Sequence, residues 1–550
     1  MITYRELRLL ELEILRSLHK SGQQVIDVSG IIWLDVDMMH GIEFEEFPAR
    51  IAEVAMWLID HQMNMQISNE FGQYFVRLPL KKSARIVHGN ALQIDWETVV
   101  AKDELSFILG NPPFLGHHYQ NEKQKKDMQL VFNGIKSVGV LDYVCAWYLK
   151  AAQYIKNTEI KVAFVSTNSI SQGEQVGLLW SLLFYKYSIK IHFAHRTFSW
   201  KNEARGNAAV HVVIIGFGNY DIPEKRLFEY DDIKGIPHEL KVKNINSYLI
   251  DGSDIIIPNR TEPINDIPKM IWGNKPTDDG NFLFDDENQK NEFVKKEPDA
   301  EKWIRPYISG SDLIQSKFRY CLWLKDINPS ELNQLKEVKQ RVEAVRKFRQ
   351  ESKAELTRSK AEIPTLFVQI SQPKSNYLAI PEVSSERRKY IPICFFDKNV
   401  IASNTIQLVP DATLWHFGIL TSLMHNIWMR SICGRLESRF RYSNSIVYNN
   451  FPFPENSTAK QIKTIEEKAQ NVLDARALFP TSSLADLYDP LTMPPALVKA
   501  HNELDKAVDL AYRPQPFTNE ANRMVFLFEL YEKYTADLFT EVKVKKTIKK

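Results

Sequence analysis

The sequence has few of the features that would set it apart from ordinary soluble proteins. Its 550 residues include only four cysteines, which lie far apart without a Cys-x-x-Cys pair, so neither a metal cluster nor a disulfide framework is expected. No apolar run reaches membrane-spanning length, and the leucine-spaced first helix carries charges throughout, unlike a signal peptide. A net charge of +2 gives no general basic surface, so nucleic-acid contacts would need local clusters. We predict a soluble protein of the reducing cytoplasm.

Short apolar segments alternate with helical ones over residues 1–225. The strand-like runs are 39–44, 84–89, 105–110, 161–167, 189–195 and 208–218. This alternation predicts an α/β protein with a doubly wound sheet that is covered on both faces. A short polar loop joins the last two runs, which predicts an antiparallel hairpin at the edge of the sheet.

The amino-acid composition of the sequence changes after residue 225. Residues 226–455 are rich in proline, asparagine, aspartate and glycine and predict a separate α+β domain. Its expected elements are irregular strands at 319–324, 365–371 and 391–396 and one long helical segment over 329–360. Residues 456–550 carry two amphipathic patterns, 458–479 and 494–512, and predict a helical third domain.

In the segment 108–116, "ILGNPPFLG", an apolar strand stops at an asparagine followed by two prolines and a phenylalanine. Proline lacks the donor that a central strand needs, so the strand ends before Asn111. Pro112 and Pro113 each keep the preceding residue extended. An amide side chain, the Pro112 carbonyl and the Phe114 ring are therefore predicted at the carboxyl edge of the sheet, where ligands bind in open α/β folds.

These groups suit methyl transfer to an exocyclic amine, whose lone pair is delocalised into its aromatic ring. Hydrogen bonds from the two amine N–H groups to the Asn111 oxygen and the Pro112 carbonyl would draw the nitrogen toward tetrahedral geometry and free its lone pair. Phe114 would stack on the flat substrate and align it with an electrophilic methyl group, a positioning effect that needs no general base. Taken alone, an Asn-Pro-Pro loop is more often a plain strand terminator.

The tetrapeptide Asn111-Pro112-Pro113-Phe114 resembles the catalytic motif of adenine-N6 DNA methyltransferases, which share a doubly wound fold and use S-adenosyl-L-methionine. The resemblance implies further roles. Glu43 ends an earlier strand, where a carboxylate in this fold takes the ribose hydroxyls of the cofactor. Asn90 and Ala91 occupy the turn that meets the cofactor's adenine. Phe198 and Trp200, in the predicted loop "RTFSWKNEARGN", resemble the aromatic residues that line the target-base pocket.

The order of these pieces, together with the downstream segment 425–454, resembles the MmeI-like family of type IIL restriction–modification enzymes over essentially the whole chain. Members join a methyltransferase to a target recognition domain and a C-terminal helical domain, which implies double-stranded DNA as the partner. Protein-glutamine and RNA methyltransferases use similar tetrapeptides, so methylation of protein or RNA is an alternative. The large recognition-like domain argues against it.

One part of the family pattern has no counterpart in the sequence. In this fold the first strand ends in a glycine-rich loop just before the helix that here reads "YRELRLLELEILR", and neither precedes Tyr4. That strand lies in mid-sheet, so its absence would leave unpaired backbone groups and an open apolar seam. We expect weak cofactor binding and impaired methylation by the chain alone. Two explanations are open: a truncated gene product, or one half of a split enzyme whose loop and nuclease come from an upstream-encoded chain. The alternative is a non-catalytic DNA-recognition subunit.

Arg435, Glu437, Arg439 and Arg441 lie at every second position of "GRLESRFRYS". On an extended segment this spacing places all four on one face. Arginine suits the O6/N7 edge of guanine and a carboxylate accepts from cytosine N4, so Glu437 with Arg439 is a candidate reader of one C·G pair. The family resemblance marks the same pair as a specificity determinant. The alternative is an exposed charge ladder with internal salt bridges.

The long helical segment also carries basic residues with fewer acids, so it could follow DNA phosphates. A solvated helix face is the stronger expectation. The basic residues are Arg341, Arg346, Lys347, Arg349, Lys353 and Arg358.

Overall fold

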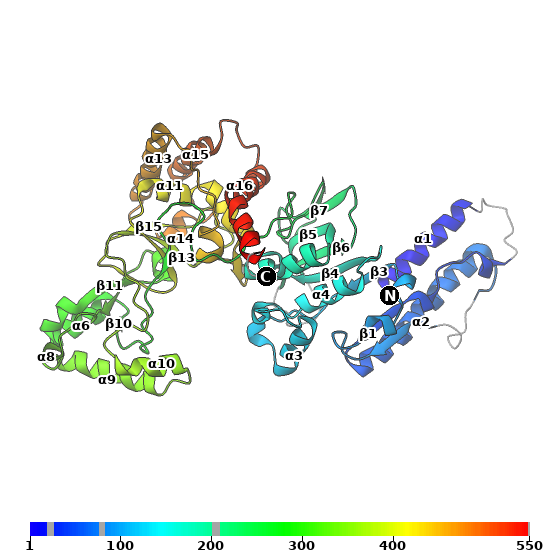
Figure 1. The fold of residues 1–550 in the computed structure, drawn as a ribbon, viewed down its shortest axis with the longest axis horizontal. Helices are drawn as coiled ribbons and strands as arrows, with labels where there is room; N and C mark the ends of the chain where they lie inside the picture. Colours follow the sequence, from blue (N-terminus) through cyan, green and yellow to red (C-terminus); the bar gives the residue numbers. More distant parts are fainter. Residues whose placement is uncertain (19–26, 76–82, 201–209, 548–550) are drawn as a thin grey trace. The chain divides into compact units, whose positions relative to one another are not determined.

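The structure is a computed structural model that describes residues 1–18, 27–75, 83–200 and 210–547 (Figure 1). The chain divides into two compact units. The first consists of Met1–Thr167, Leu178–Arg196 and Val212–Phe228, and the second of Asn168–Gly177, Thr197–His211 and Glu229–Lys550. No helix in the described ranges is long and apolar enough to cross a bilayer.

The α/β region, predicted over residues 1–225, extends to residue 242 in the structure, because β7 (Lys225–Glu229) and β8 (His238–Val242) belong to its larger sheet. Its helices are α1 (Ile2–Leu18), α2 (Glu46–Phe71), α3 (Glu122–Val131), α4 (Cys145–Tyr154) and α5 (Glu174–Ser181). Its strands are β1 (His40–Glu43), β2 (Arg85–His88), β3 (Phe107–Gly110), β4 (Lys161–Thr167), β5 (Lys190–Trp200), β6 (Val210–Gly218), β7 (Lys225–Glu229) and β8 (His238–Val242). The predicted alternation of strands and helices is confirmed.

Two sheets share these strands. β1 and β2 form a parallel pair, and the other six strands follow the order β3-β4-β6-β5-β7-β8. β3 runs parallel to β4, β4 antiparallel to β6, and β5 parallel to β7, so the larger sheet is mixed. The prediction that the β5–β6 pair closes the sheet edge is wrong, because β7 and β8 extend the sheet beyond β5. β5 also continues to Trp200, so Phe198 and Trp200 belong to a strand and not to a loop.

The α/β region is interrupted between its two sheets. Within the described ranges, β1 is paired only with β2, and β3 only with β4. Phe107 and Leu109 of β3 are 56% and 58% exposed, although strands of parallel sheets are normally buried on both faces. The predicted open apolar seam is therefore present at the free edge of β3.

Helices α1 and α2 are joined by a buried polar cluster. The Tyr4 hydroxyl donates to Asp60 Oδ1 at 2.6 Å, and the fully buried Arg8 donates to Asn64 Oδ1 at 2.8 Å. Tyr4 also packs in an apolar core whose other buried members are Val36, Met56, Ile59, Met63 and Ala84. Because Ala84 directly precedes β2, this core attaches both helices to the β1–β2 sheet.

The second unit contains the remaining elements. Its helices are α6 (Glu287–Lys296), α7 (Gly310–Gln315), α8 (Pro329–Leu332), α9 (Lys336–Gln350), α10 (Glu355–Ser359), α11 (Leu414–Thr421), α12 (Leu423–Ile432), α13 (Ala459–Ala477), α14 (Leu484–Leu487), α15 (Pro495–Tyr512) and α16 (Glu520–Thr547). Its strands are β9 (Ile271–Trp272), β10 (Leu283–Phe284), β11 (Ile304–Ile308), β12 (Arg319–Leu322), β13 (Tyr377–Pro381), β14 (Val383–Ser384), β15 (Cys394–Phe396), β16 (Ile401–Ala402), β17 (Ile406–Pro410), β18 (Gly434–Leu436) and β19 (Arg439–Arg441).

Two predictions for this unit are wrong in detail. The single helical segment over 329–360 is divided into α8, α9 and α10, because Leu335 and Ala354 adopt extended backbone angles before α9 and α10 begin. Residues 365–371 form no regular strand and contribute one isolated bridge, from Gln369 to Lys275. The strands predicted at 319–324 and 391–396 are present as β12 and β15, and the two C-terminal amphipathic patterns as α13 and α15.

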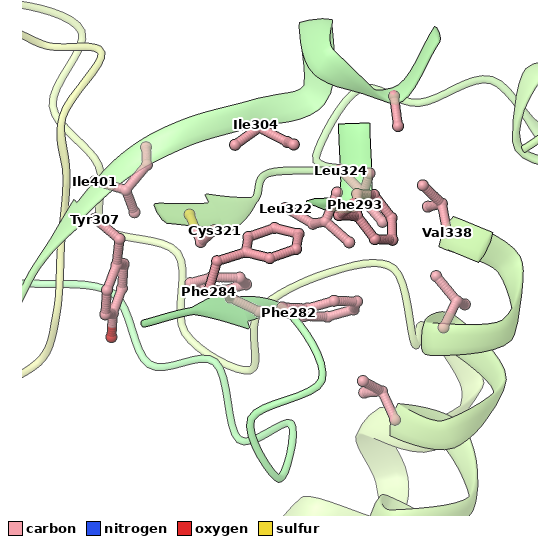
Figure 2. Close-up of a cluster of buried hydrophobic side chains, with 14 of the residues drawn as sticks. Phe282, Phe284, Phe293, Ile304, Tyr307, Cys321, Leu322, Leu324, Val338 and Ile401 are labelled. Atoms are coloured by element: carbon pink, nitrogen blue, oxygen red, sulfur yellow. The ribbon is translucent and has the colours of Figure 1, made fainter. Parts of the chain in front are cut away.

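A lobe of the second unit is built around aromatic side chains (Figure 2). Its core joins β10, β11 and β12 to α6 and α9, and includes Phe282, Phe284, Phe293, Ile304, Tyr307, Cys321, Leu322, Leu324, Val338 and Ile401. Arg341 of α9 lies over the Phe284 and Phe293 rings at 4.5 and 4.7 Å. The half-buried Arg341 therefore packs against the aromatic rings of this core.

Arg349, the penultimate residue of α9, is fully buried. Its guanidinium donates to the carbonyls of Pro276 at 2.9 Å and Leu366 at 2.8 Å. It also donates to the carbonyls of Thr277, Lys360 and Ile363. One side chain thus satisfies carbonyls from two separate segments, and the suggestion that Arg349 follows DNA phosphates is wrong.

The C-terminal helices enclose a buried carboxyl group. Asp505 of α15 accepts hydrogen bonds from the Tyr390 hydroxyl and the Leu423 amide, both at 2.7 Å. Burial raises the pKa of Asp505 to about 6. This carboxyl group therefore ties α15 to the start of α12 and to the segment before β15.

Candidate active site

The tetrapeptide follows β3 directly. Gly110 ends the strand, where a Cβ atom would lie 3.0 Å from the Phe164 ring of β4, so glycine lets β3 approach its neighbour closely. Asn111 and Pro113 are exposed, Pro112 is buried and Phe114 is half-buried. Within the described ranges, the Asn111 side chain makes no hydrogen bond to the protein. Its amide oxygen is therefore available to a ligand.

The end of this loop is fixed by a buried carboxylate. The Leu115 amide donates to Asp142 Oδ1 at 3.0 Å, and the Tyr143 amide donates back to the Leu115 carbonyl at 3.0 Å. Asp142 also accepts from the Val144 amide at 3.2 Å and from the Thr167 hydroxyl at 3.3 Å. Burial raises the pKa of Asp142, and the hydrogen bonds that it accepts oppose that shift.

The candidate cofactor residues follow the two strands of the small sheet. The parallel register pairs Glu43 with His88, so Glu43 and the turn that holds Asn90 and Ala91 lie at the same carboxyl edge. One Glu43 oxygen accepts the Glu45 amide at 3.1 Å. The other oxygen has no protein partner within the described ranges, which leaves it free for a hydroxyl donor.

The Asn90 side chain is already bound at both ends. Its oxygen accepts the Leu92 amide at 2.9 Å, and its NH₂ group donates to Asp127 Oδ2 at 2.9 Å. The buried Asp127 also accepts from Gln93 at 2.8 Å and from the Tyr143 hydroxyl at 2.7 Å. Burial and the contact with Asp127 raise the pKa of Tyr143. Asn90 thus shapes the turn, and its oxygen keeps one lone pair for a ligand.

These groups fit the ribose and adenine parts of S-adenosyl-L-methionine. A free carboxylate oxygen at Glu43 suits a ribose hydroxyl. The amide of Ala91 has no backbone partner in the described turn, and it suits an acceptor nitrogen of adenine. The chemistry of this donor and acceptor set therefore agrees with the cofactor that the sequence resemblance implies.

The two candidate pocket aromatics lie on β5. The Phe198 ring stacks on Tyr230, with ring centroids 5.1 Å apart and planes 17° from parallel. Trp200 is the last residue of the strand, and its side chain lies outside what the structure describes.

The four candidate recognition residues do not share one face, so that prediction is wrong. The segment folds back as a hairpin of β18 and β19, with Glu437 at the turn in a left-handed conformation, φ 59°. The register places Arg435 opposite Phe440, and Gly434 opposite Arg441. Because neighbours along a strand alternate between faces, Arg435 lies on the opposite face from Arg439 and Arg441.

The hairpin separates packed residues from exposed ones. Arg435 lies 4.0 Å over the buried Phe440 ring. Arg439 donates to Glu437 at 2.8 Å in an exposed ion pair at the tip, and Arg441 donates to Glu382 at 2.9 Å. One internal salt bridge of the alternative interpretation, Arg439–Glu437, is therefore present, and it leaves both side chains accessible.

Close backbone contact holds the base of this hairpin. The Gly173 amide donates to the Ile432 carbonyl at 3.0 Å, and a Cβ atom on Gly173 would lie 3.0 Å from the Gly434 Cα. Arg435 donates to Gln172 at 3.2 Å beside this contact. The hairpin is thus anchored at its base, and its tip is exposed.

Comparison with known proteins identifies the family. The sequence matches the MmeI DNA-methyltransferase domain over residues 1–229, the MmeI target recognition domain over 251–455 and the MmeI C-terminal domain over 457–539. A solved structure of the type IIL restriction-modification enzyme MmeI in complex with DNA is 55% identical. It covers 97% of this chain and 71% of its own, with a TM-score of 0.87. The chain belongs to the MmeI family.

A curated relative is similar over nearly the whole chain. DNA methyltransferase A of Bacillus subtilis (strain 168) is 37% identical over 538 residues, which are 97% of this chain. The chain spans 60% of the length of that relative.

In this member of the MmeI family, sequence reasoning missed Asp127, Asp142 and Tyr143. None of them belongs to the tetrapeptide, so the chemistry of that motif gave no reason to select them. The available signal was an Asp-Tyr pair at the start of the apolar pattern 142–155. A carboxylate at the head of such a segment needs donors, and here the donors are the amides and hydroxyls around the site.

Proposed function

We propose that this chain is the catalytic and recognition part of a site-specific DNA adenine-N6 methyltransferase of a restriction–modification system. The observation that carries the proposal is the free amide of Asn111. It stands directly after β3, beside a buried proline and a half-buried phenylalanine. The loop that carries it is fixed by internal hydrogen bonds, yet Asn111 itself has no protein partner in the described ranges.

The proposed reaction depends on two acceptors for one amine. The Asn111 oxygen and the Pro112 carbonyl take the two N–H groups of adenine N6 and localise the nitrogen lone pair. Phe114 stacks on the base and holds it in line for attack, which lowers the barrier by positioning. S-adenosyl-L-methionine supplies the electrophilic methyl group when bound. Glu43 and the turn of Asn90 and Ala91 would hold its ribose and its adenine.

A duplex hides adenine N6, so the target base must leave the helix. Extrusion costs a few kcal/mol, which stacking and hydrogen bonding in the pocket would offset. We propose that Phe198 and Trp200 are aromatic residues of the pocket that receives this base. The Phe198–Tyr230 stack supports an aromatic surface on β5.

We propose that Glu437 and Arg439 read one C·G pair at the tip of the hairpin. Their exposure and their mutual contact support joint readout, since a carboxylate can accept from cytosine N4 while arginine donates to guanine. The double substitution Glu437→Lys with Arg439→Asp should change the preferred base at one position of the site. An unchanged methylation site would rule out this assignment.

We propose that catalysis needs a strand and a glycine-rich loop from outside residues 1–550. The unpaired edges of β1 and β3 and the exposed Phe107 and Leu109 support this proposal. The same observations favour a second candidate function, a DNA-recognition subunit without catalysis of its own.

Tritiated methyl transfer to DNA separates the two functions. The chain would be assayed alone, and again with the part of the solved MmeI chain that has no counterpart here, added as a separate polypeptide. Transfer only in the mixture supports a methyltransferase completed by another segment, and no transfer in either supports the recognition subunit. Titration calorimetry with S-adenosyl-L-methionine checks the same point, because micromolar binding by the chain alone would contradict the need for completion.

A further inference from the structure

We propose that the neighbouring residues Asp142 and Tyr143 are positioning residues, each for a different half of the active site. Asp142 holds the loop that offers Asn111 to the base. Tyr143 holds, through Asp127, the turn that meets the cofactor's adenine. The assignment of the two halves rests on the proposed methyltransferase function, whereas the two sets of contacts do not.

Three hydrogen bonds that Asp142 accepts join the tetrapeptide loop to its support. Its Oδ1 accepts the amide of Leu115, the residue after Phe114, and also the Val144 amide at the start of α4. Its Oδ2 accepts from Thr167, the last residue of β4. One 4% exposed carboxyl group thus joins the loop, a helix and the strand next to β3. Without it, the Leu115 and Val144 amides lose their acceptor.

The contacts of Tyr143 concern the other half. Its hydroxyl donates to Asp127 Oδ2 at 2.7 Å, and the same oxygen accepts from Asn90. Asn90 in turn accepts the Leu92 amide, which closes the turn around Ala91. The Tyr143 ring packs edge-on against Trp147 at 5.1 Å, so removing only the hydroxyl preserves this packing.

The adjacency of the two residues has a physical consequence. The side chains of Asp142 and Tyr143 extend from one short backbone segment. The Tyr143 amide of this segment also donates a hydrogen bond to the Leu115 carbonyl. The distance between the loop that binds the base and the turn that binds the cofactor is therefore set by one short segment before α4. Methyl transfer depends on that distance, and an error of about 1 Å can cost roughly 100-fold in rate.

Substitutions can separate the two roles. Asp142→Ala removes every acceptor, whereas Asp142→Asn keeps an oxygen for the two amides and an NH₂ group that can donate to Thr167. Tyr143→Phe removes only the hydroxyl. In the completed enzyme we expect Asp142→Ala to lower kcat about 100-fold with little change in the cofactor KM, and Asp142→Asn to restore most of it. We expect Tyr143→Phe to raise the cofactor KM about tenfold with a smaller change in kcat.

Hydrogen exchange measured by mass spectrometry tests the contacts without activity. Asp142→Ala should speed exchange in residues 111–116, and Tyr143→Phe in residues 88–95. If Asp142→Ala does not fold, Thr167→Val, which removes one donor to Asp142, should give a smaller effect in 111–116. The proposal is overturned if both variants speed exchange equally in both segments, or in neither. It is also overturned if both lower kcat alike with an unchanged cofactor KM.

Failure of the proposed function gives a different result. If the completed wild-type enzyme transfers no methyl group to DNA, the methyltransferase assignment fails. Separate exchange effects in the two segments would still support the positioning contacts, and their absence would contradict them.

Discussion

The asparagines that follow β2 and β3 lie in opposite surroundings, and their alanine substitutions should separate catalysis from stability. Asn111 is exposed and without a protein partner in the described ranges. Asn111→Ala should therefore change the free energy of unfolding by less than about 0.5 kcal/mol. If its oxygen accepts from the amine in the transition state, its loss should lower kcat by about 10²–10³, or about 3–4 kcal/mol.

Asn90 provides the matched control. The oxygen of its side chain accepts a hydrogen bond from the Leu92 backbone amide, and its NH₂ group donates to the buried Asp127. Asn90→Ala should cost about 1–3 kcal/mol of stability, because both groups lose a partner. It should also raise the cofactor KM, because the turn around Ala91 loses its support.

The assay is initial-rate transfer of tritiated methyl groups to DNA by the completed enzyme at saturating cofactor. Denaturant unfolding of each variant gives the stability term separately. Full turnover after Asn111→Ala would refute the role of this oxygen. Equal effects of the two variants on both stability and rate would refute the distinction drawn from their surroundings.

Three further predictions concern stability. Arg349→Met should lower the free energy of unfolding by at least ~3 kcal/mol, because buried carbonyls lose their donor, whereas Arg346→Met on the exposed side of α9 should change it by less than ~0.5 kcal/mol. Equal losses in urea unfolding would contradict this. Gly110→Ala should cost about 1–3 kcal/mol by the same measurement, because its Cβ atom would press on Phe164; an unchanged midpoint would show that the ring yields freely. Burial raises the pKa of Asp505 from 3.8 to about 6, so its contribution to stability is fully present below pH 3.8 and is lost as the pH rises through 6. Wild type should therefore lose up to about 3 kcal/mol relative to Asp505→Asn between pH 4 and 7, and parallel unfolding curves for the two proteins would contradict the shift.

Sequence reasoning located elements whose signal is local. The strand that ends before Asn111 was predictable, because two consecutive prolines cannot continue a central strand. The helices α13 and α15 were predictable from their apolar periodicity. The interrupted sheet was predictable from the family pattern, and the free edges of β1 and β3 agree with it.

Features that depend on tertiary contacts were missed. The alternating charges of 435–441 were interpreted as one face of an extended segment. The chain reverses at Glu437 in a left-handed conformation, and the sequence has no glycine or asparagine at that position to indicate the turn. Arg349 looked like a surface cation, because its carbonyl partners at Pro276 and Leu366 lie outside its own helix, in segments that the helical pattern does not place. Asp142 lacked a visible role until the Leu115 amide was placed beside it.

In the β18–β19 hairpin, the residues that stabilise the fold are different from the residues that are exposed at the tip. The base of the hairpin is stabilised by the close approach of Gly173 to Gly434 and by the buried Phe440 ring. The tip residues Glu437 and Arg439 are exposed and contribute little to any core. Exchanging the tip residues therefore leaves the scaffold intact. If Glu437 and Arg439 read DNA as proposed, substitutions at these two positions can change the recognised base pair while the folded hairpin keeps its stability.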